Sequence, residues 1–142
     1  MPTRPTTVCS ELQLRLVVPG ASSLPVQAEL RYDVAGSYAV QVAFHTGASN
    51  GDEIVEWTFA RSLLGDGVTG ASGEGDVQVW PSSSGGDAVV CLSLSSPSGR
   101  ALFEVPLRAL ADFLTRTYDA VPAGNEGDHV DLDGELALLL WT

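Results

Sequence analysis

The sequence predicts an α+β protein in which antiparallel strands come first and helices follow. Apolar and polar residues alternate in many segments of the first two thirds of the chain, which is typical of half-buried strands. The links between these segments are short and rich in turn-forming residues, which favours antiparallel neighbours. Near the end, the apolar spacing changes to three and four residues, as in amphipathic helices. With 142 residues, 44% of them hydrophobic, the chain can bury one core, so residues 1–142 are predicted to form a single domain with a flexible stretch at 1–8.

Four strands are predicted first, followed by a short helix. The period of two is clearest where Leu12, Leu14 and Leu16 alternate with charged and polar neighbours. The predicted strands cover residues 12–16, 26–32, 38–45 and 55–59. A helix of one or two turns is expected over 60–64, ended by the glycines at positions 65 and 67.

A second group of three strands follows a glycine-rich loop. These strands are predicted at residues 77–80, 88–95 and 101–105. A loop is expected over 81–87, and Ser96-Pro97-Ser98-Gly99 has the composition of a tight turn. The two groups are therefore expected to form antiparallel sheets of four and three strands.

Two helices are predicted after the last strand. The first covers residues 107–121, and its apolar stripe consists of Leu107, Leu110, Phe113, Leu114, Thr117, Tyr118 and Val121. Pro106 is expected at its first position. The second begins at Asp131 or Asp133, either of which can cap it, and places Leu132, Leu136, Leu139 and Leu140 on one side.

The charge of the chain limits its partners. The net charge is −11, and all seven basic residues are arginines. Such a chain is repelled by nucleic acids and by anionic lipids. No segment has the length and apolarity of a membrane span, and the first residues lack the apolar region of a signal peptide. The protein is therefore expected to be cytoplasmic, without direct membrane insertion, with Cys9 and Cys91 as reduced thiols.

The apparent cofactor and metal motifs in the sequence lack the structural context that such sites need. Residues 65–70 match G-x-G-x-x-G, but a predicted helix precedes them and a loop follows, the reverse of a dinucleotide site. Residues 128–135 are acidic, yet an EF-hand alignment places His129 and Leu140 where carboxylates are needed. A metal site of His129, Asp131 and Asp133 is a weaker alternative to a capped helix. No cofactor, metal site or catalytic residue is therefore predicted; the rival reading is an enzyme that uses His45 or His129.

Two surfaces are candidates for partner binding. Trp80 lies opposite Val77 and Val79 on a regular strand, which makes it the aromatic residue expected at a subunit contact. The helix at 107–121 carries four charged residues away from its apolar stripe: Arg108, Asp112, Arg116 and Asp119. The alternatives are an ordinary solvated helix face and a contact through the strand face bearing Gln27, Glu29 and Arg31.

Several segments together resemble the SsgA-like sporulation and cell division proteins of filamentous actinobacteria. The residues that carry the resemblance are Cys9 to Val18, Leu24-Pro25-Val26, Glu56-Trp57-Thr58-Phe59-Ala60-Arg61, Gly75 to Pro81, Phe113-Leu114 with Arg116-Thr117, and Asp131-Leu132-Asp133. They occur in order over nearly the whole chain, and they are most similar to one subgroup of that family.

The resemblance implies a fold similar to the Whirly single-stranded-nucleic-acid binders, assembled as a homotrimer. It also implies a non-enzymatic adaptor at the cell septum, whose partners are the tubulin-like ring protein FtsZ and SsgA-type proteins. In that role the chain would recruit FtsZ to future septum sites and promote its polymerisation during sporulation. Two alternatives stay open: a binder of single-stranded nucleic acid, and a family member acting in septal peptidoglycan or spore maturation.

Overall fold

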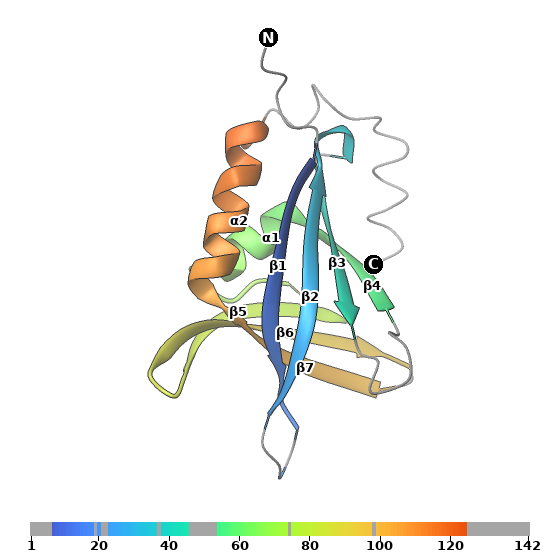
Figure 1. Ribbon diagram of the computed structural model, residues 1–142, viewed down its shortest axis with the longest axis vertical. Helices are drawn as coiled ribbons and strands as arrows, with labels where there is room; N and C mark the ends of the chain where they lie inside the picture. The colour runs from blue at the N-terminus through green and yellow to red at the C-terminus, as the bar shows by residue number, and fades with distance from the viewer. Residues whose placement is uncertain are drawn as a thin grey trace.

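A computed structural model of the chain describes residues 7–18, 20, 23–36, 38–45, 54–73, 75–97 and 99–124. Within these residues, seven strands form one antiparallel sheet, and two α-helices pack against it (Figure 1). The predicted α+β class and its order of strands, short helix, strands and helix are confirmed. The predicted helix at 131–140 and the acidic stretch at 128–135 lie outside the described residues.

The first four strands form the predicted meander. They are β1 (Thr7–Leu16), β2 (Leu24–Asp33), β3 (Ala39–His45) and β4 (Ile54–Ala60), with a 3-10 turn at Val34–Gly36 after β2. Each strand pairs antiparallel with the next, for example Leu14 with Val26 and Val42 with Trp57. The alternation in the sequence corresponds to an apolar inner face and a polar outer face. β1 begins at Thr7, and Val8 within it is buried; the flexible stretch at 1–8 stays a prediction.

The second group consists of β5 (Val77–Ser84), β6 (Asp87–Ser96) and β7 (Gly99–Pro106). The loop predicted at 81–87 is wrong, because β5 continues through Pro81 and turns only at Gly85-Gly86. Both glycines have positive φ, 57° and 89°, which this tight connection requires. Proline is tolerated in β5 because β5 is an edge strand, where one row of N–H groups makes no ladder bond.

The two predicted sheets are in fact one sheet, with the strand order β4-β3-β2-β1-β7-β6-β5. The two groups meet where Arg15 pairs with Glu104 and Leu16 pairs with Phe103. Figure 1 shows β5–β7 crossing the direction of β1–β4, so the sheet bends sharply at this short junction. Local alternation could not reveal the junction, because β1 and β7 are far apart in the sequence.

The helices are α1 (Arg61–Gly67) and α2 (Leu107–Ala120). Of the two glycines predicted to end the short helix, Gly65 lies within α1 and Gly67 is its last residue, so the helix extends past the predicted 60–64. In α2, the buried residues Leu110, Phe113, Leu114 and Thr117 all belong to the predicted apolar stripe. Pro106 is the last residue of β7 rather than the first residue of α2.

The core lies between the inner faces of the bent sheet and the two helices. Its largest apolar side chains with almost no exposure are Tyr32, Phe44, Phe59 and Phe113. The rings of Phe44 in β3 and Phe103 in β7 stack with centroids 4.7 Å apart, so one aromatic pair joins the two halves of the sheet. Strands from both halves of the sheet therefore contribute side chains to one core.

Candidate partner-binding surfaces

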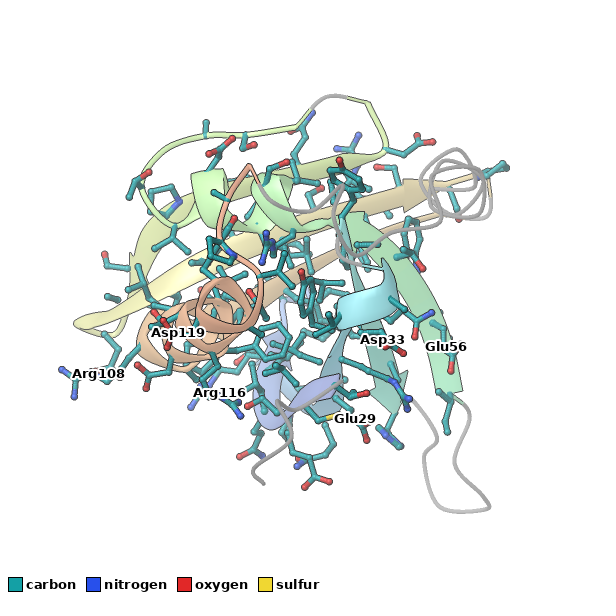
Figure 2. The ribbon with its side chains drawn as sticks, turned by 90° about the horizontal axis from the view of Figure 1, so that it is seen from above. Glu29, Asp33, Glu56, Arg108, Arg116 and Asp119 are labelled. Carbon is teal, nitrogen blue, oxygen red and sulfur yellow. The ribbon has the colours of Figure 1, made fainter. Side chains whose placement is uncertain are left out.

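The outer side of α2 carries the four charged residues singled out in the sequence. Arg108, Asp112, Arg116 and Asp119 are all exposed, and spacings of four, four and three residues place them along one face of the helix. Figure 2 shows Arg108, Arg116 and Asp119 pointing away from the core. This row, called the α2 charged face below, is available to a partner, and its role in binding stays a prediction.

Arg116 differs from the other three members of this face because it also connects α2 to the sheet. Its Nη2 donates a hydrogen bond of 3.1 Å to the carbonyl oxygen of Cys9 in β1. Its guanidinium carbon lies 6.0 Å from the centroid of the Phe113 ring. A substitution of Arg116 therefore changes the packing of α2 as well as the charge of its surface.

The outer face of the first four strands carries a row of acidic residues. The strand register places Glu11 opposite Glu29, Glu29 opposite Ala43, and Ala43 opposite Glu56. Glu11 and Glu56 are exposed, and Figure 2 shows Glu29 and Glu56 on the strands, away from α2. Directly opposed like charges repel one another, so this row favours a cationic partner and disfavours a phosphate backbone.

Trp80 lies in the edge strand β5, on the face opposite the buried Val77 and Val79, as predicted. It is half-buried rather than exposed. The free side of β5 is partly closed by Ser72, which exchanges backbone hydrogen bonds of 2.7 and 2.8 Å with Val79. Trp80 therefore lies in a shallow recess beside Ser72 and Gly73. Its role at a subunit contact stays a prediction.

Cys91 is buried on β6 and has the environment of a packing residue. Burial raises the pKa of its thiol, the nearby Glu104 carboxylate raises it further, and a hydrogen bond with Ser82 acts in the opposite direction. A thiol with a raised pKa is a poor nucleophile at neutral pH. Cys9, in contrast, is exposed on β1.

The other chemical motifs also have structural explanations where the structure describes them. Gly65 and Gly67 lie inside α1, and Gly70 follows it with its N–H bonded to the Asp66 carbonyl at 3.0 Å. This glycine run ends a helix instead of beginning one, so it cannot present a helix N-terminus to a phosphate. His45 ends β3, and His129 lies outside the described residues. Within the described part of the chain, no group of three or more His, Cys, Asp and Glu residues could hold a metal ion.

Arg61, a residue that the sequence reasoning did not single out, is the most deeply buried charged residue described. Its Nη1 donates hydrogen bonds of 3.0 Å to the Thr117 carbonyl and 2.7 Å to the Val121 carbonyl, at the end of α2. Its guanidinium carbon lies 5.0 Å from the Tyr32 ring centroid and 4.0 Å from that of Tyr118. A positive charge at the C-terminus of a helix complements the helix dipole. The sequence did contain one indication that Arg61 is important: it ends the segment Glu56 to Arg61, which resembles the SsgA-like proteins.

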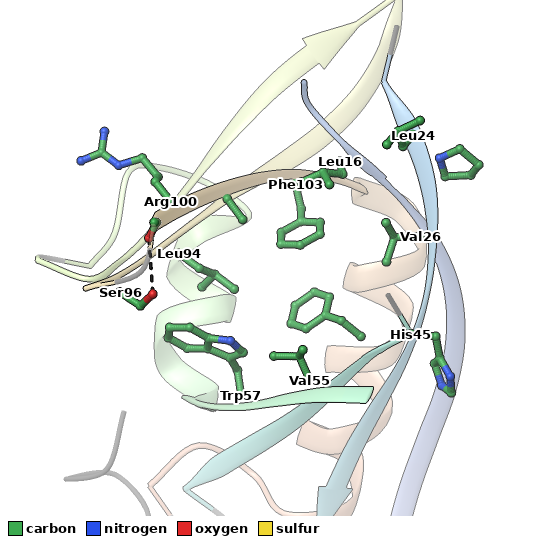
Figure 3. A pocket seen from close by; sticks show the side chains of 14 residues that line it. Leu16, Leu24, Val26, His45, Val55, Trp57, Leu94, Ser96, Arg100 and Phe103 are labelled. Carbon is green, nitrogen blue, oxygen red and sulfur yellow. Dashed lines mark hydrogen bonds between the residues drawn. The ribbon is translucent and has the colours of Figure 1, made fainter. Parts of the chain in front are cut away.

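An apolar pocket of about 550 Å³ opens where the inner faces of the two sheet halves diverge. It is lined by aliphatic and aromatic side chains from both halves, among them Leu16, Leu24, Val26, Val55, Trp57, Leu94 and Phe103 (Figure 3). Arg100 and Ser96 lie at the rim, and His45 lies away from the aromatic rings in the same view. The polar groups are therefore peripheral, and the interior suits apolar side chains.

No helix among the described residues has the length and apolarity needed to cross a membrane.

Comparisons with known proteins give consistent matches. Residues 26–126 match the family model described as Streptomyces sporulation and cell division protein, SsgA. The sporulation-specific cell division protein SsgB of Frankia casuarinae is 57% identical over 99% of this chain and 96% of its own length. The protein of the same name from Streptomyces coelicolor is 59% identical over 95% of this chain and 96% of its own length.

Two solved structures agree with the fold described above. One, from work on mutations in SsgB that correlate with longitudinal cell division during sporulation of Streptomyces coelicolor, is 57% identical. It covers 91% of this chain and 99% of its own, with a TM-score of 0.83. The crystal structure of an SsgA-like sporulation-specific cell division protein from Thermobifida fusca is 44% identical, covers 96% and 98%, and has a TM-score of 0.82.

Proposed function

Since this chain belongs to the SsgA family of sporulation and cell division proteins, we propose that it is an adaptor of SsgB type. In this role it recruits FtsZ to future septum sites and promotes FtsZ polymerisation during sporulation-specific cell division. The observation that carries the proposal is identity of 57% and 59%, over nearly the whole chain, to proteins named SsgB. Those names support a role in sporulation cell division. That FtsZ is the partner is our proposal.

The chemistry of the described residues supports an adaptor over an enzyme. The buried thiol of Cys91 has a raised pKa, and the glycine run ends α1 without forming a phosphate loop. Charged side chains, in contrast, lie along the outer side of α2, and Glu11, Glu29 and Glu56 lie in register on the outer face of the strands. Surfaces of this kind suit electrostatic steering toward a protein partner.

We place the FtsZ contact on the α2 charged face, with SsgA-type proteins as further partners. The protein acts in the cytoplasm at the septum, and its attachment to the membrane is indirect, through another protein. Its working form is a homotrimer, so light scattering should give about three times the chain mass of 14.8 kDa. If light scattering shows only a monomer at micromolar concentration, the proposed trimer is wrong, but the membership of the SsgA family is unaffected.

A fluorescent fusion imaged together with FtsZ in a sporulating host tests the function. We expect the fusion to reach future septum sites before the FtsZ ring forms there, because a recruiting protein must precede what it recruits. Arrival only after the ring, during wall assembly, would contradict recruitment and favour a role in septal peptidoglycan or spore maturation.

Arg108→Glu tests the contact surface. Arg108 is exposed on α2, so reversing its charge should weaken co-sedimentation with FtsZ polymers roughly tenfold, which corresponds to about 1.4 kcal/mol. Arg116→Glu is a poorer test, since it also removes the hydrogen bond to Cys9.

Arg100→Glu is the matched control for this prediction. Arg100 is also exposed, but it lies at the start of β7, roughly 20 Å along the strand from the beginning of α2. Its reversal should leave FtsZ binding unchanged. If Arg108→Glu has no effect and Arg31→Glu weakens binding, the contact lies on the outer face of the strands instead.

A further inference from the structure

Two apolar surfaces lie on opposite sides of the strands β5–β7. On the inner side, Leu94 and Phe103 line the apolar pocket between the sheet halves (Figure 3). Leu24 and Val55 also line this pocket and are 53% and 44% exposed, and Ile54 beside Val55 is 53% exposed. Among the described residues, these three are the exposed large hydrophobic side chains. Exposure that is clustered in this way marks an interaction site.

The outer side of the same strands carries few charges at its centre. The strand register places nine positions side by side there: Gln78, Ser93 and Leu102; Trp80, Cys91 and Glu104; Ser82, Val89 and Pro106. Of these nine, Glu104 alone is charged, and its carboxylate accepts a hydrogen bond of 3.2 Å from Ser84 Oγ. An aromatic residue among uncharged neighbours is typical of the core of a protein–protein interface. This surface is called the Trp80 face below.

We propose that the Trp80 face of one copy of the chain packs over the apolar pocket of a second copy, around Leu24 and Val55. The contact is head-to-tail, because the two copies contribute different surfaces to it. Since it supplies the interface of the homotrimer proposed above, this inference rests on that part of the proposed function. It does not depend on FtsZ binding, which is placed on α2.

The charge distribution favours these two surfaces for a contact between copies. Each chain has a net charge of −11, so two copies repel each other wherever their acidic groups meet. The row of glutamates on the outer face of β1–β4 opposes a contact of this kind. Among the described residues that line the pocket, in contrast, none is acidic, and the ionisable ones are His45 and Arg100. The Trp80 face, with Glu104 as its single charge, therefore meets little repulsion at the pocket.

A single head-to-tail contact covers both surfaces. If each surface packed against the same surface of another copy, two separate interfaces would be needed to cover them. Every chain carries one Trp80 face and one pocket, so a second copy always brings the matching surface. Head-to-tail contacts between identical chains form closed rings or open filaments. A ring of three chains covers the Trp80 face and the pocket of every copy, as the proposed homotrimer requires.

Added carboxylates test the two sides of the contact. Leu24→Asp places a charge at the pocket, and Gln78→Asp places one at an exposed position beside Trp80. Where the unmodified protein is trimeric, light scattering should give the mass of one chain for each variant, because the contact would bury an unpaired carboxylate. Gln41→Asp, the same change at an exposed position on the outer face of β3, is the matched control and should leave the trimer intact. Circular dichroism checks that each variant is folded.

A mixture of the two variants tests the head-to-tail arrangement itself. Leu24→Asp keeps an intact Trp80 face, and Gln78→Asp keeps an intact pocket. Equal amounts should therefore form a dimer held by one interface, although neither variant associates alone. A mixture that stays monomeric would overturn the proposal, and so would a trimer that persists in either variant. If the unmodified protein is a monomer, this interface and the homotrimer are both wrong, whereas FtsZ binding is tested separately by Arg108→Glu.

Discussion

At the scale of single residues, Arg61 shows how a buried charge is accommodated. Its side chain is 1% exposed, and two carbonyl oxygens at the end of α2 accept its hydrogen bonds. Two tyrosine rings contact the guanidinium, which a planar and weakly hydrated cation tolerates better than an ammonium group would. Arg61 therefore attaches the start of α1 to the end of α2, and its role is structural.

Replacing Arg61 with methionine should lower the free energy of unfolding by about 3 kcal/mol. The variant keeps an unbranched side chain but leaves the Thr117 and Val121 carbonyls without these donors, and hydrogen bonds from charged groups contribute about 1.5–3 kcal/mol each. Urea unfolding measures the change. Arg116→Met, at an exposed position with one hydrogen bond to Cys9, should cost only about 1 kcal/mol. Equal losses in the two variants would refute the role assigned to Arg61.

At the scale of elements, the contact between α1 and β5 explains why a glycine lies inside a helix. Gly67 is buried in α1, and a Cβ built on it would overlap the side chain of Val79 in β5. The helix and the strand approach each other more closely than any larger residue permits. The glycine that was read as a helix stop is therefore required by packing.

Gly67→Ala should destabilise the protein by about 1–2 kcal/mol. Alanine favours helix formation by up to about 1 kcal/mol over glycine, but overpacking of a core contact costs about 1–3 kcal/mol, and here packing outweighs propensity. Thermal unfolding of the variant checks the sign. In Gly70→Ala the new methyl group meets open space, so that variant should change stability by less than about 0.5 kcal/mol. A stabilised Gly67→Ala protein would show that α1 can shift away from β5.

At the scale of the whole molecule, the charge distribution is opposite in sign to that of a typical nucleic-acid-binding surface. The net charge is −11, and the strand register concentrates Glu11, Glu29 and Glu56 on the outer face of the sheet. A phosphate backbone needs the opposite sign of charge on such a face. We therefore expect this protein not to bind single-stranded nucleic acid, and a similar fold would not by itself imply that function.

Single-stranded DNA should not bind to the protein even at low salt, where electrostatic attraction is strongest. A mobility-shift titration at about 10 mM ionic strength with a fluorescent oligonucleotide is the appropriate measurement. Glu29→Arg combined with Glu56→Arg serves as a comparison, because it places two positive charges on the same face. A shift with the unmodified protein would favour the nucleic-acid alternative over the adaptor.

The sequence by itself predicted seven strands and the amphipathic helix that follows them, because alternation and helical spacing record which face of each element is buried. The family was indicated by the resemblance of particular segments, and not by this periodicity. The sequence did not show that β5 continues past Pro81 or that α1 includes Gly67, since an edge position and a close helix–strand approach are set by neighbours. The tertiary structure alone decided that β1 and β7 join the strand groups into one sheet. It also brought Arg61 to the end of α2 and opened a pocket between the halves. The physical reason is that such pairings depend on which distant surfaces fit together, whereas periodicity describes only each segment's own burial.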